Sequence, residues 1–227
     1  MEVKLVAKTV PVVEGLEDAQ DLLSYCARVS NPDNQMNTKT GGGLLNYCIK
    51  HKHFSIFETV NLVMSIETTR DIGRQILRHR SFSFQEFSGR YSTMAAEMVP
   101  RELRIQDTKN KQNSIATPED DLLSNHFQNI QEEVFETAYE MYEDALRNGI
   151  AKECARALLP EGLIKTNMYM NGTLRSWLHF CQVRCGVETQ KECRLIAKEA
   201  ARIIISEFPV LSKLIQPLLE DSYSAEV

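Results

Sequence analysis

The chain lacks a G-x-G-x-x-G motif, a C-x-x-C pair and any apolar run near the ~18 residues of a membrane span. Its first six residues also lack the apolar core of a secretory signal peptide. The missing glycine motif argues against a Rossmann dinucleotide fold. From the other absences we expect a protein of a reducing, cytoplasmic compartment, in which all six cysteines are free thiols.

Basic residues are also fewer than acidic ones. The chain has 26 Lys and Arg residues and 31 Asp and Glu residues, which gives a net charge of -5. Binding to nucleic acid or to an anionic membrane is dominated by basic charge, so neither is an expected partner of the whole surface. A length of 227 residues allows one large domain or two small ones, and 43% apolar residues are ordinary for a globular protein.

Periodicity predicts a mixture of strands and longer helices. Alternating residues predict strands over residues 3–10, 60–67 and 165–171. Apolar residues at gaps of three and four predict helices over residues 15–28, 44–52, 68–80, 118–149, 150–159, 189–207 and 209–219, and a further helix from Thr173. Residues 106–118 have no apolar pattern and predict an exposed or mobile loop. We expect an α+β fold, about half helix, with mixed helices around a central, largely antiparallel sheet.

Residues 78–92, with the sequence RHRSFSFQEFSGRYS, concentrate hydrogen-bond donors. Guanidinium forks and serine hydroxyls bind phosphate and carboxyl oxygens, and the aromatic rings add flat apolar surface. Because the protein as a whole is acidic, this local basic stretch indicates a pocket for small anions, which we interpret as two nucleotides. The alternative is a set of helix-ending charges that point into water.

Two other groups of residues suggest metal sites, but both have ordinary explanations. His51, His53 and Glu58 would suit zinc, yet no third strong ligand follows at a recognisable spacing. The cysteines at 181, 185 and 193 are separated by gaps of four and eight, which also fit one face of a helix. We therefore expect no metal.

The basic stretch contains Arg78-His79-Arg80, seven further residues and then Ser88, extended as Ser88-Gly89-Arg90. This pattern resembles the signature of flavin-dependent thymidylate synthases, a family unrelated to the thymidylate synthases with a cysteine nucleophile. The likeness continues in Ala27-Arg28-Val29-Ser30, His51-x-His53-x-Ser55-x-Phe57-Glu58, Arg74-Gln75, Ala155-Arg156 with Leu159-Pro160, Arg175-Ser176 and Arg184. It covers nearly the whole chain, so a single domain is expected over residues 1–227.

The resemblance implies a homotetramer with shared active sites, bound FAD, dUMP as substrate, methylenetetrahydrofolate as carbon donor and NADPH as reductant. It implies that FAD contacts Ser30, Ser55, Arg78, His79, Arg80, Glu86, Arg175 and His179, with Ser55 reaching it from a neighbouring subunit. It implies that dUMP contacts Gln75, Arg78, Glu86, Ser88, Gly89, Arg90, Arg156 and Arg184, with Arg184 at the uracil edge.

The implied chemistry has reduced flavin deliver hydride, so that no cysteine adds to the pyrimidine. Arg184 is the expected catalytic residue, because a fixed positive charge stabilises negative charge developing on the ring, an effect of about 3 kcal/mol. Cys185 is the alternative nucleophile, since neighbouring Arg184 can lower the pKa of its thiol.

The chain departs from the family pattern at three places. Gln85 replaces a frequent Asn, Glu188 replaces a frequent His, and residues 160–173 are one residue longer than in some relatives. Two other function classes also remain: a module that binds nucleic acid or a phosphoprotein, and a metal-dependent hydrolase that uses His51, His53 and Glu58.

Overall fold

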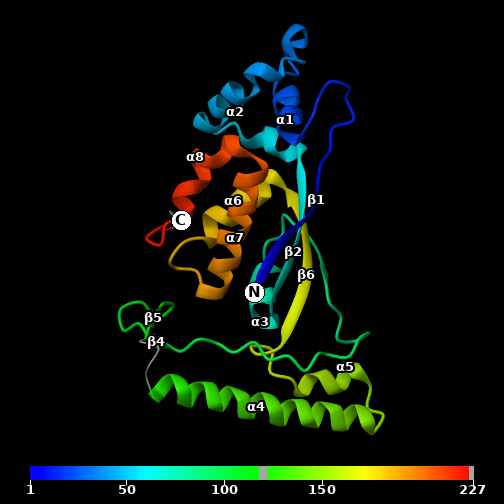
Figure 1. The fold of residues 1–227 in the computed structure, drawn as a ribbon, viewed down its shortest axis with the longest axis vertical. Coiled ribbons are helices and arrows are strands. Elements are labelled where there is room, and N and C mark those ends of the chain that lie inside the picture. The colour runs from blue at the N-terminus through cyan, green and yellow to red at the C-terminus, as the bar shows by residue number, and fades with distance from the viewer. Residues whose placement is uncertain (118–121, 225–227) are drawn as a thin grey trace. The chain divides into compact units, whose positions relative to one another are not determined.

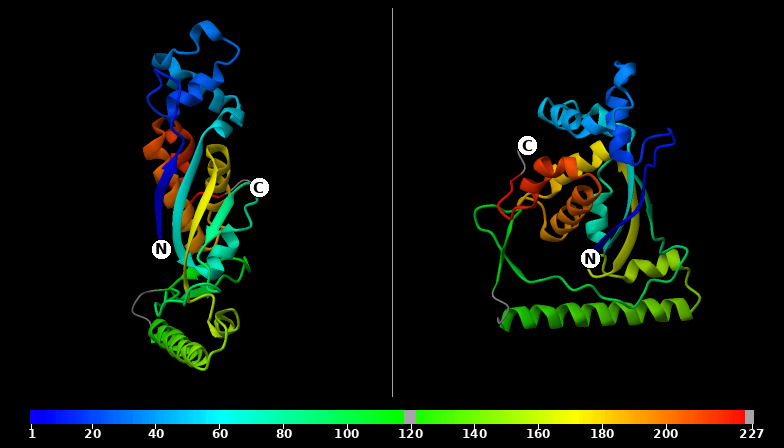
Figure 2. Two further views of the ribbon diagram at one scale, coloured as in Figure 1. Left: turned by 90° about the vertical axis from the view of Figure 1, so that its right-hand side faces the viewer. Right: turned by 45° about the horizontal axis from the view of Figure 1, so that its top comes forward.

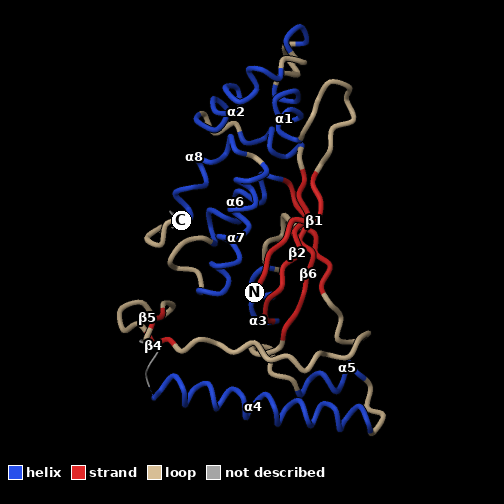
Figure 3. The backbone as a smooth tube through the Cα atoms, in the orientation of Figure 1, coloured by secondary structure: helices blue, strands red, loops and turns tan. Residues whose placement is uncertain are grey.

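The computed structural model describes residues 1–117 and 122–224 and confirms the α+β class, with about half of the chain helical (Figures 1 and 3). The main sheet is antiparallel, with strand order β1-β2-β6-β3. Its strands are β1 (Glu2–Lys8), β2 (Asn61–Thr69), β3 (Ser83–Glu86) and β6 (Lys165–Thr173). A separate hairpin consists of β4 (Arg104–Gln106) and β5 (Ser114–Ala116).

The helices are α1 (Ala19–Ala27), α2 (Gly41–Lys50), α3 (Arg70–Ile76), α4 (Leu122–Arg147), α5 (Lys152–Ala155), α6 (Leu174–Arg184), α7 (Lys191–Glu207) and α8 (Ser212–Ile215). Short 3-10 helices include Phe54–Thr59, Arg156–Leu158, Pro209–Leu211 and Gln216–Leu219. Among the described residues, no helix combines the length and the hydropathy that crossing a bilayer requires.

The chain divides into two compact units, each assembled from segments that are distant in sequence. The first unit comprises Met1–Ile66, His79–Gln85 and Tyr169–Val227, and the second comprises Glu67–Arg78 and Glu86–Met168. The basic stretch is therefore divided between the two units. His79 to Gln85 belong to the first unit, while Arg78 and the residues from Glu86 onward belong to the second. Each unit contains its own candidate binding residues.

The core of the first unit forms where β2 meets α6. The predicted alternation is confirmed, because Leu62, Met64 and Ile66 are all fully buried. The side chain of Thr173 caps α6 by accepting a hydrogen bond from the amide of Ser176. The indole of buried Trp177 donates to the carbonyl of Leu62 over 3.2 Å, so its polar atom is satisfied in the core. Helices α6 and α7 pack side by side (Figure 2).

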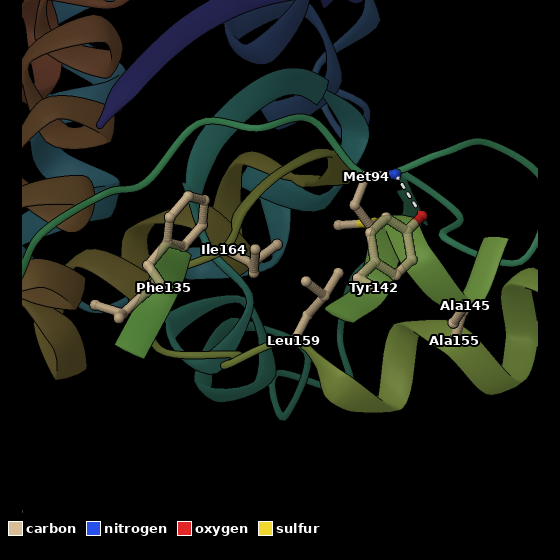
Figure 4. Close-up of a cluster of buried hydrophobic side chains, with 8 residues drawn as sticks. Met94, Phe135, Tyr142, Ala145, Ala155, Leu159 and Ile164 are labelled. Atoms are coloured by element: carbon tan, nitrogen blue, oxygen red, sulfur yellow. Dashed lines mark hydrogen bonds between the residues drawn. The ribbon is translucent and has the colours of Figure 1, made fainter. Parts of the chain in front are cut away.

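The core of the second unit is a cluster on one face of α4 (Figure 4). Tyr142 and Phe135 pack there with Met94, Leu159 and Ile164. The buried hydroxyl of Tyr142 accepts a hydrogen bond of 3.0 Å from the amide of Met94. This contact fixes the loop that follows the basic stretch.

Several predicted helices begin or end at residues other than those expected. The helix predicted over 68–80 is α3, because the β-branched Thr68 and Thr69 extend β2 instead, and residues 78–80 form a turn. The helix predicted from residue 44 already begins at Gly41, where a Cβ atom would lie 2.9 Å from Ser24 Oγ. Close packing on α1 therefore outweighs the low helix propensity of glycine.

Other boundaries differ because short polar segments make their own hydrogen bonds. Residues 106–118 contain an exposed hairpin, in which the carboxylate of Asp107 accepts from the amides of Lys109 and Asn110 and from the side chain of Asn113. The segment 209–219 contains three short helices instead of one. The predicted start of the longest helix, at residues 118–121, lies outside the described residues.

Candidate functional site

A cavity of about 280 Å³ in the second unit concentrates positive charge. Three arginines line it, namely Arg70, Arg74 and Arg156. Glu153 and Glu161 also line it, and Met94, Leu159 and Ile164 supply apolar surface. Such a mixture can hold an anionic group on one side and a flat apolar group on the other.

The carboxylate of Glu161 interacts with two of these arginines, Arg74 and Arg70. It accepts a bond of 2.7 Å from Nε of Arg74 and a second, shorter bond from Nη2 of the same guanidinium. The hydrogen bonds from Arg74 are the main cause that lowers the pKa of Glu161. Nε of Arg70 lies 3.9 Å from the same carboxylate. Glu161 thus holds Arg74 in a fixed bidentate geometry.

One guanidinium nitrogen of Arg70 lacks a hydrogen-bond acceptor among the described residues. This atom, Nη1, lies 3.7 Å from Glu86, too far for a good hydrogen bond, and is buried. A buried, unsatisfied guanidinium donor is costly, so it favours an anionic ligand in this cavity. Glu86 is itself fixed at the end of β3, where it accepts a 2.9 Å bond from Thr166.

The turn after β3 places Gly89 and Arg90 next to residues that line the cavity. The carbonyl of Ser88 accepts hydrogen bonds from the amides of Tyr91 and Ser92, which closes the turn. Gly89 is buried, and a Cβ there would lie 2.8 Å from Met94 Sδ and 3.6 Å from Arg156 Cδ. A side chain at this position would therefore require Met94 to shift, whereas its contact with Arg156 would be of ordinary length.

The guanidinium of Arg90 lies 3.1 Å from the carboxylate of Glu153. The structure thus brings together Gly89, Arg90 and Arg156 of the predicted dUMP set. Gln75, on α3, is half-buried in the same unit, whereas Arg78 is exposed in the turn after this helix.

The first unit joins His79 to Arg184. Nε of Arg184 donates a 2.8 Å hydrogen bond to Nε2 of His79, which assigns the imidazole proton to Nδ1. The imidazole packs edge-on against Phe180, with ring centroids 5.0 Å apart. Burial, then the charges of Arg184 and His179, lower the pKa of His79 to about 4. The histidine is therefore neutral near pH 7 and acts as an acceptor.

A second cavity, of about 520 Å³, lies in the first unit beside α6. Its lining includes Arg175 and His179, which lie four residues apart on the exposed face of this helix. Arg175 donates a 2.6 Å bond to Glu58, which also lines the cavity. The remaining lining residues are Phe54, Ser81, Ser176, Leu178 and Gln182.

Six residues of the predicted FAD set do not line this cavity, namely Ser30, Ser55, Arg78, His79, Arg80 and Glu86. Ser30 follows α1, Ser55 lies in the 3-10 helix Phe54–Thr59, and Arg80 lies in the turn after α3; all three are exposed. Their assignment therefore rests on the resemblance.

Sequence reasoning missed Arg70 and Glu161, and it considered Glu58 as a zinc ligand but not as the partner of Arg175. A signal existed for Arg70, because it lies four residues before Arg74 and so shares a face with it on a helix. Glu161 and Glu58 carry no such signal, since their partners are 87 and 117 residues away.

The suggested zinc set receives no support. The rings of His51 and His53 lie 6.0 Å apart, and both side chains are exposed. Glu58 pairs with Arg175. Within residues 1–117 and 122–224, no three His, Cys, Asp or Glu side chains are grouped in a way that could hold a metal ion.

The cysteines near Arg184 are inaccessible. Cys181 and Cys193 are fully buried, and Cys185 is 1% exposed. Burial raises the pKa of Cys193 to about 11. The pKa of Cys185 is lowered, first by a hydrogen bond from Cys181 and further by the charges of Lys198 and Arg202, but its sulfur has no open path to a substrate.

Comparison with known proteins agrees with this arrangement. Residues 11–210 match the sequence model of a family described as thymidylate synthase complementing protein. A probable flavin-dependent thymidylate synthase of Paramecium bursaria Chlorella virus 1 is 48% identical over 94% of this chain and 98% of its own length. A flavin-dependent thymidylate synthase of Synechocystis sp. is 45% identical over 95% of this chain and 100% of its own length.

A solved structure shares the fold. It is a UMP/dUMP methylase, PolB of Streptomyces cacaoi, bound with 5-Br dUMP. The alignment has a TM-score of 0.79 and 24% identity, and it covers 95% of this chain and 94% of that chain. At this level of identity the comparison establishes the fold alone.

Proposed function

Because the chain belongs to the flavin-dependent thymidylate synthase family, we propose that it converts dUMP to dTMP by reductive methylation. FAD is the cofactor, methylenetetrahydrofolate donates the carbon and NADPH is the reductant. The observation that carries the proposal is the three-arginine cavity, with its unsatisfied Arg70 donor, beside the Gly89 turn. The protein acts as a single domain over residues 1–227 and as a homotetramer with shared sites.

The dUMP phosphate is bound by Ser88, Arg90 and Arg156. Hydroxyl and guanidinium donors suit phosphate oxygens, and close approach of the Gly89 backbone to Arg156 allows both to contact one group. Glu86, held by Thr166, is an acceptor for a sugar hydroxyl. Gln75 and Arg78 complete the substrate set.

Six of the eight residues proposed for the flavin lie in the first unit, and Arg78 and Glu86 lie in the second. The cavity beside α6 offers a flat ring in Phe54, donors in Arg175 and His179, and a hydroxyl in Ser81. These are the groups that a dinucleotide needs. His79 contributes its imidazole, and Arg78, Arg80, Glu86, Ser30 and Ser55 complete the set, with Ser55 coming from a neighbouring subunit. When bound, the flavin supplies the hydride.

Arg184 is the catalytic residue among the chain's own side chains. It stabilises negative charge on the uracil ring as C5 attacks the carbon donor. His79 accepts one of its N–H groups and, being neutral, leaves the positive charge on Arg184 available. No cysteine nucleophile takes part, which agrees with the burial of Cys185.

The first test is reconstitution. Purified protein with FAD should show absorbance bands near about 370 and 450 nm and should form dTMP only when dUMP, methylenetetrahydrofolate and NADPH are all present. A colourless protein that forms no dTMP after FAD addition would reject the proposal.

The second test concerns the substrate cavity. Arg156→Gln should raise KM for dUMP about ten- to hundred-fold, because a hydrogen bond to a charged group contributes about 1.5–3 kcal/mol. Arg147→Gln is the matched control, since Arg147 pairs with Asp144 on the exposed end of α4, away from the cavity lining. Equal KM values in both variants would remove Arg156 from the dUMP site.

A further inference from the structure

The last described residues, 219–224, form a tail outside residues 11–210, the part that matches the family. This tail binds the segment that carries Arg184. The hydroxyl of Tyr223 donates a 2.9 Å bond to the carbonyl of Gln182, and the carbonyl of Tyr223 accepts a 2.9 Å bond from the amide of Val187. Two contacts from one tyrosine thus bracket Arg184 on both sides in sequence.

The neighbouring tail residue adds a third contact, because the hydroxyl of Ser224 donates to the carboxylate of Glu188. All three contacts fall within seven consecutive residues, 182–188, at the end of α6 and the loop after it. The chain leaves α6 there, so the helix no longer fixes the backbone direction. The tail supplies the missing restraint.

A buried lysine anchors the base of the tail. Lys198 on α7 is 4% exposed, and an ammonium group in such a place needs partners for its three donors. The tail provides all three, through the carbonyls of Leu219 and Glu220 at 3.0 and 3.1 Å and through the carboxylate of Asp221 at 2.8 Å. Lys198 also lowers the pKa of Asp221. The tail is therefore fixed to the same helix that packs on α6.

The carbonyl of Val187 is also hydrogen-bonded, in this case to α7. It accepts a 3.1 Å bond from Arg194, while the amide of Val187 donates to Tyr223. Val187 is thus clamped between the helix and the tail, three residues after Arg184. The Arg184 side chain itself donates its hydrogen bond to His79.

We propose that residues 219–224 are a positioning element for Arg184. Lys198 fixes the tail, Tyr223 fixes the backbone on both sides of Arg184, and the guanidinium is thereby kept against His79. The consequence for turnover rests on the proposed function, whereas the position of Arg184 can be measured without it.

The experiment compares a chain that ends at Glu220 with a matched control that ends at Ser224 and keeps every tail contact described above. The single Trp177 reports folding by its fluorescence. The readout is the titration of His79 by NMR in the apoprotein, assigned with His79→Gln. Burial and the charges of Arg184 and His179 should keep the pKa of His79 at about 4 in the control, and the shorter chain should titrate at a higher pH because Arg184 no longer lies against the imidazole.

A point variant carries the same test if the shorter chain does not fold. Tyr223→Phe removes only the hydroxyl that binds Gln182. It should raise the pKa of His79 and lower kcat about five-fold, the effect expected of about one hydrogen bond, with KM for dUMP unchanged. In an Arg184→Ala background the same substitution should cause no further loss.

An unchanged His79 titration in a folded shorter chain, or in Tyr223→Phe, would overturn the positioning role. Equal losses with and without Arg184 would also overturn it, because the tail would then act through general stability. A shifted titration with unchanged kcat would support the positioning role and would instead reject the catalytic role proposed for Arg184.

Discussion

Arg184 keeps a permanent positive charge beside an imidazole that is kept neutral. The 2.8 Å bond from Arg184 to Nε2 of His79 requires an unprotonated acceptor, and burial of His79 disfavours its charged form in the same direction. The hydrogen-bond geometry and the burial of His79 therefore favour the same protonation state. In that state the guanidinium is oriented, and its charge is not opposed by a second cation.

Replacing Arg184 should separate catalysis from folding. Arg184→Ala should lower kcat about 100-fold, as expected for removal of one charge-stabilising donor worth about 3 kcal/mol. Folding and some flavin binding should persist, because Arg184 is only half-buried and does not belong to the apolar core. Steady-state kinetics and the flavin spectrum provide the measurement. Near-normal kcat would remove Arg184 from the mechanism.

His79 should make stability depend on pH. Its pKa falls from the usual 6.5 to about 4 in the folded protein, so the unfolded chain binds more protons between these values. Lowering the pH from 7 to 5 should therefore lower the free energy of unfolding, by about 1–2 kcal/mol after allowance for partial solvation.

The control for this pH effect is His79→Gln, which keeps an acceptor for Arg184 but does not titrate. Urea unfolding at both pH values gives the comparison. The loss between pH 7 and pH 5 should be smaller in the variant; equal losses would mean that His79 does not carry the effect.

At the level of secondary-structure elements, β6 packs closely against the basic stretch at Gly172. A Cβ atom at Gly172 would lie 2.4 Å from Cδ1 of Phe82, whose ring packs against Trp177 at 4.9 Å. Phe82 follows the His79-Arg80 turn by two residues. Gly172 is thus what allows the Phe82 ring to lie so close to the strand.

Gly172→Ala should lower the free energy of unfolding by about 1–3 kcal/mol, because a buried ring must shift to make room. Gly43→Ala is a suitable control: a Cβ there meets nothing within 4 Å, and α2 should be unchanged or slightly more stable. Thermal unfolding measures both. Equal melting temperatures for the two variants would contradict the packing of Phe82 described above.

The sequence predicted most elements but not all of their ends. Strong periodicity located β2, β6 and α6, since Leu62 and Trp177 fall on the faces that are buried. The strand β3 was missed because its alternating residues are at most half-buried. The hairpin of β4 and β5 was missed because local bonds to Asp107 stabilise it, without an apolar pattern.

The site was predictable where the motif is contiguous and not where it depends on distant partners. Residues 78–90 were recognisable from their order alone. The pairing of Arg74 with Glu161, and of Arg175 with Glu58, needs segments that only folding brings together. The tail residue Tyr223 was unremarkable for the same reason, since its partners are about 40 residues away.

The protein as a whole is acidic, but basic side chains are grouped in two places. One is the arginine-lined cavity of the second unit, and the other is the cavity beside α6 in the first unit. The net charge of -5 argues against general polyanion binding, while the arginine-lined cavity of the second unit offers charge only to a small ligand. The Cys181, Cys185 and Cys193 thiols are buried beside α7 rather than exposed to a ligand. Under the proposed function, methylation of the pyrimidine needs no thiolate.

The most direct measurement is the rate of dTMP formation by Cys185→Ser, with FAD content measured on the same sample. Cys185 is the cysteine whose pKa is lowered and which follows Arg184 in sequence, so it is the strongest candidate for a nucleophile. The account predicts a rate close to that of the unchanged protein. Abolished dTMP formation in a sample that folds and retains its flavin would contradict it.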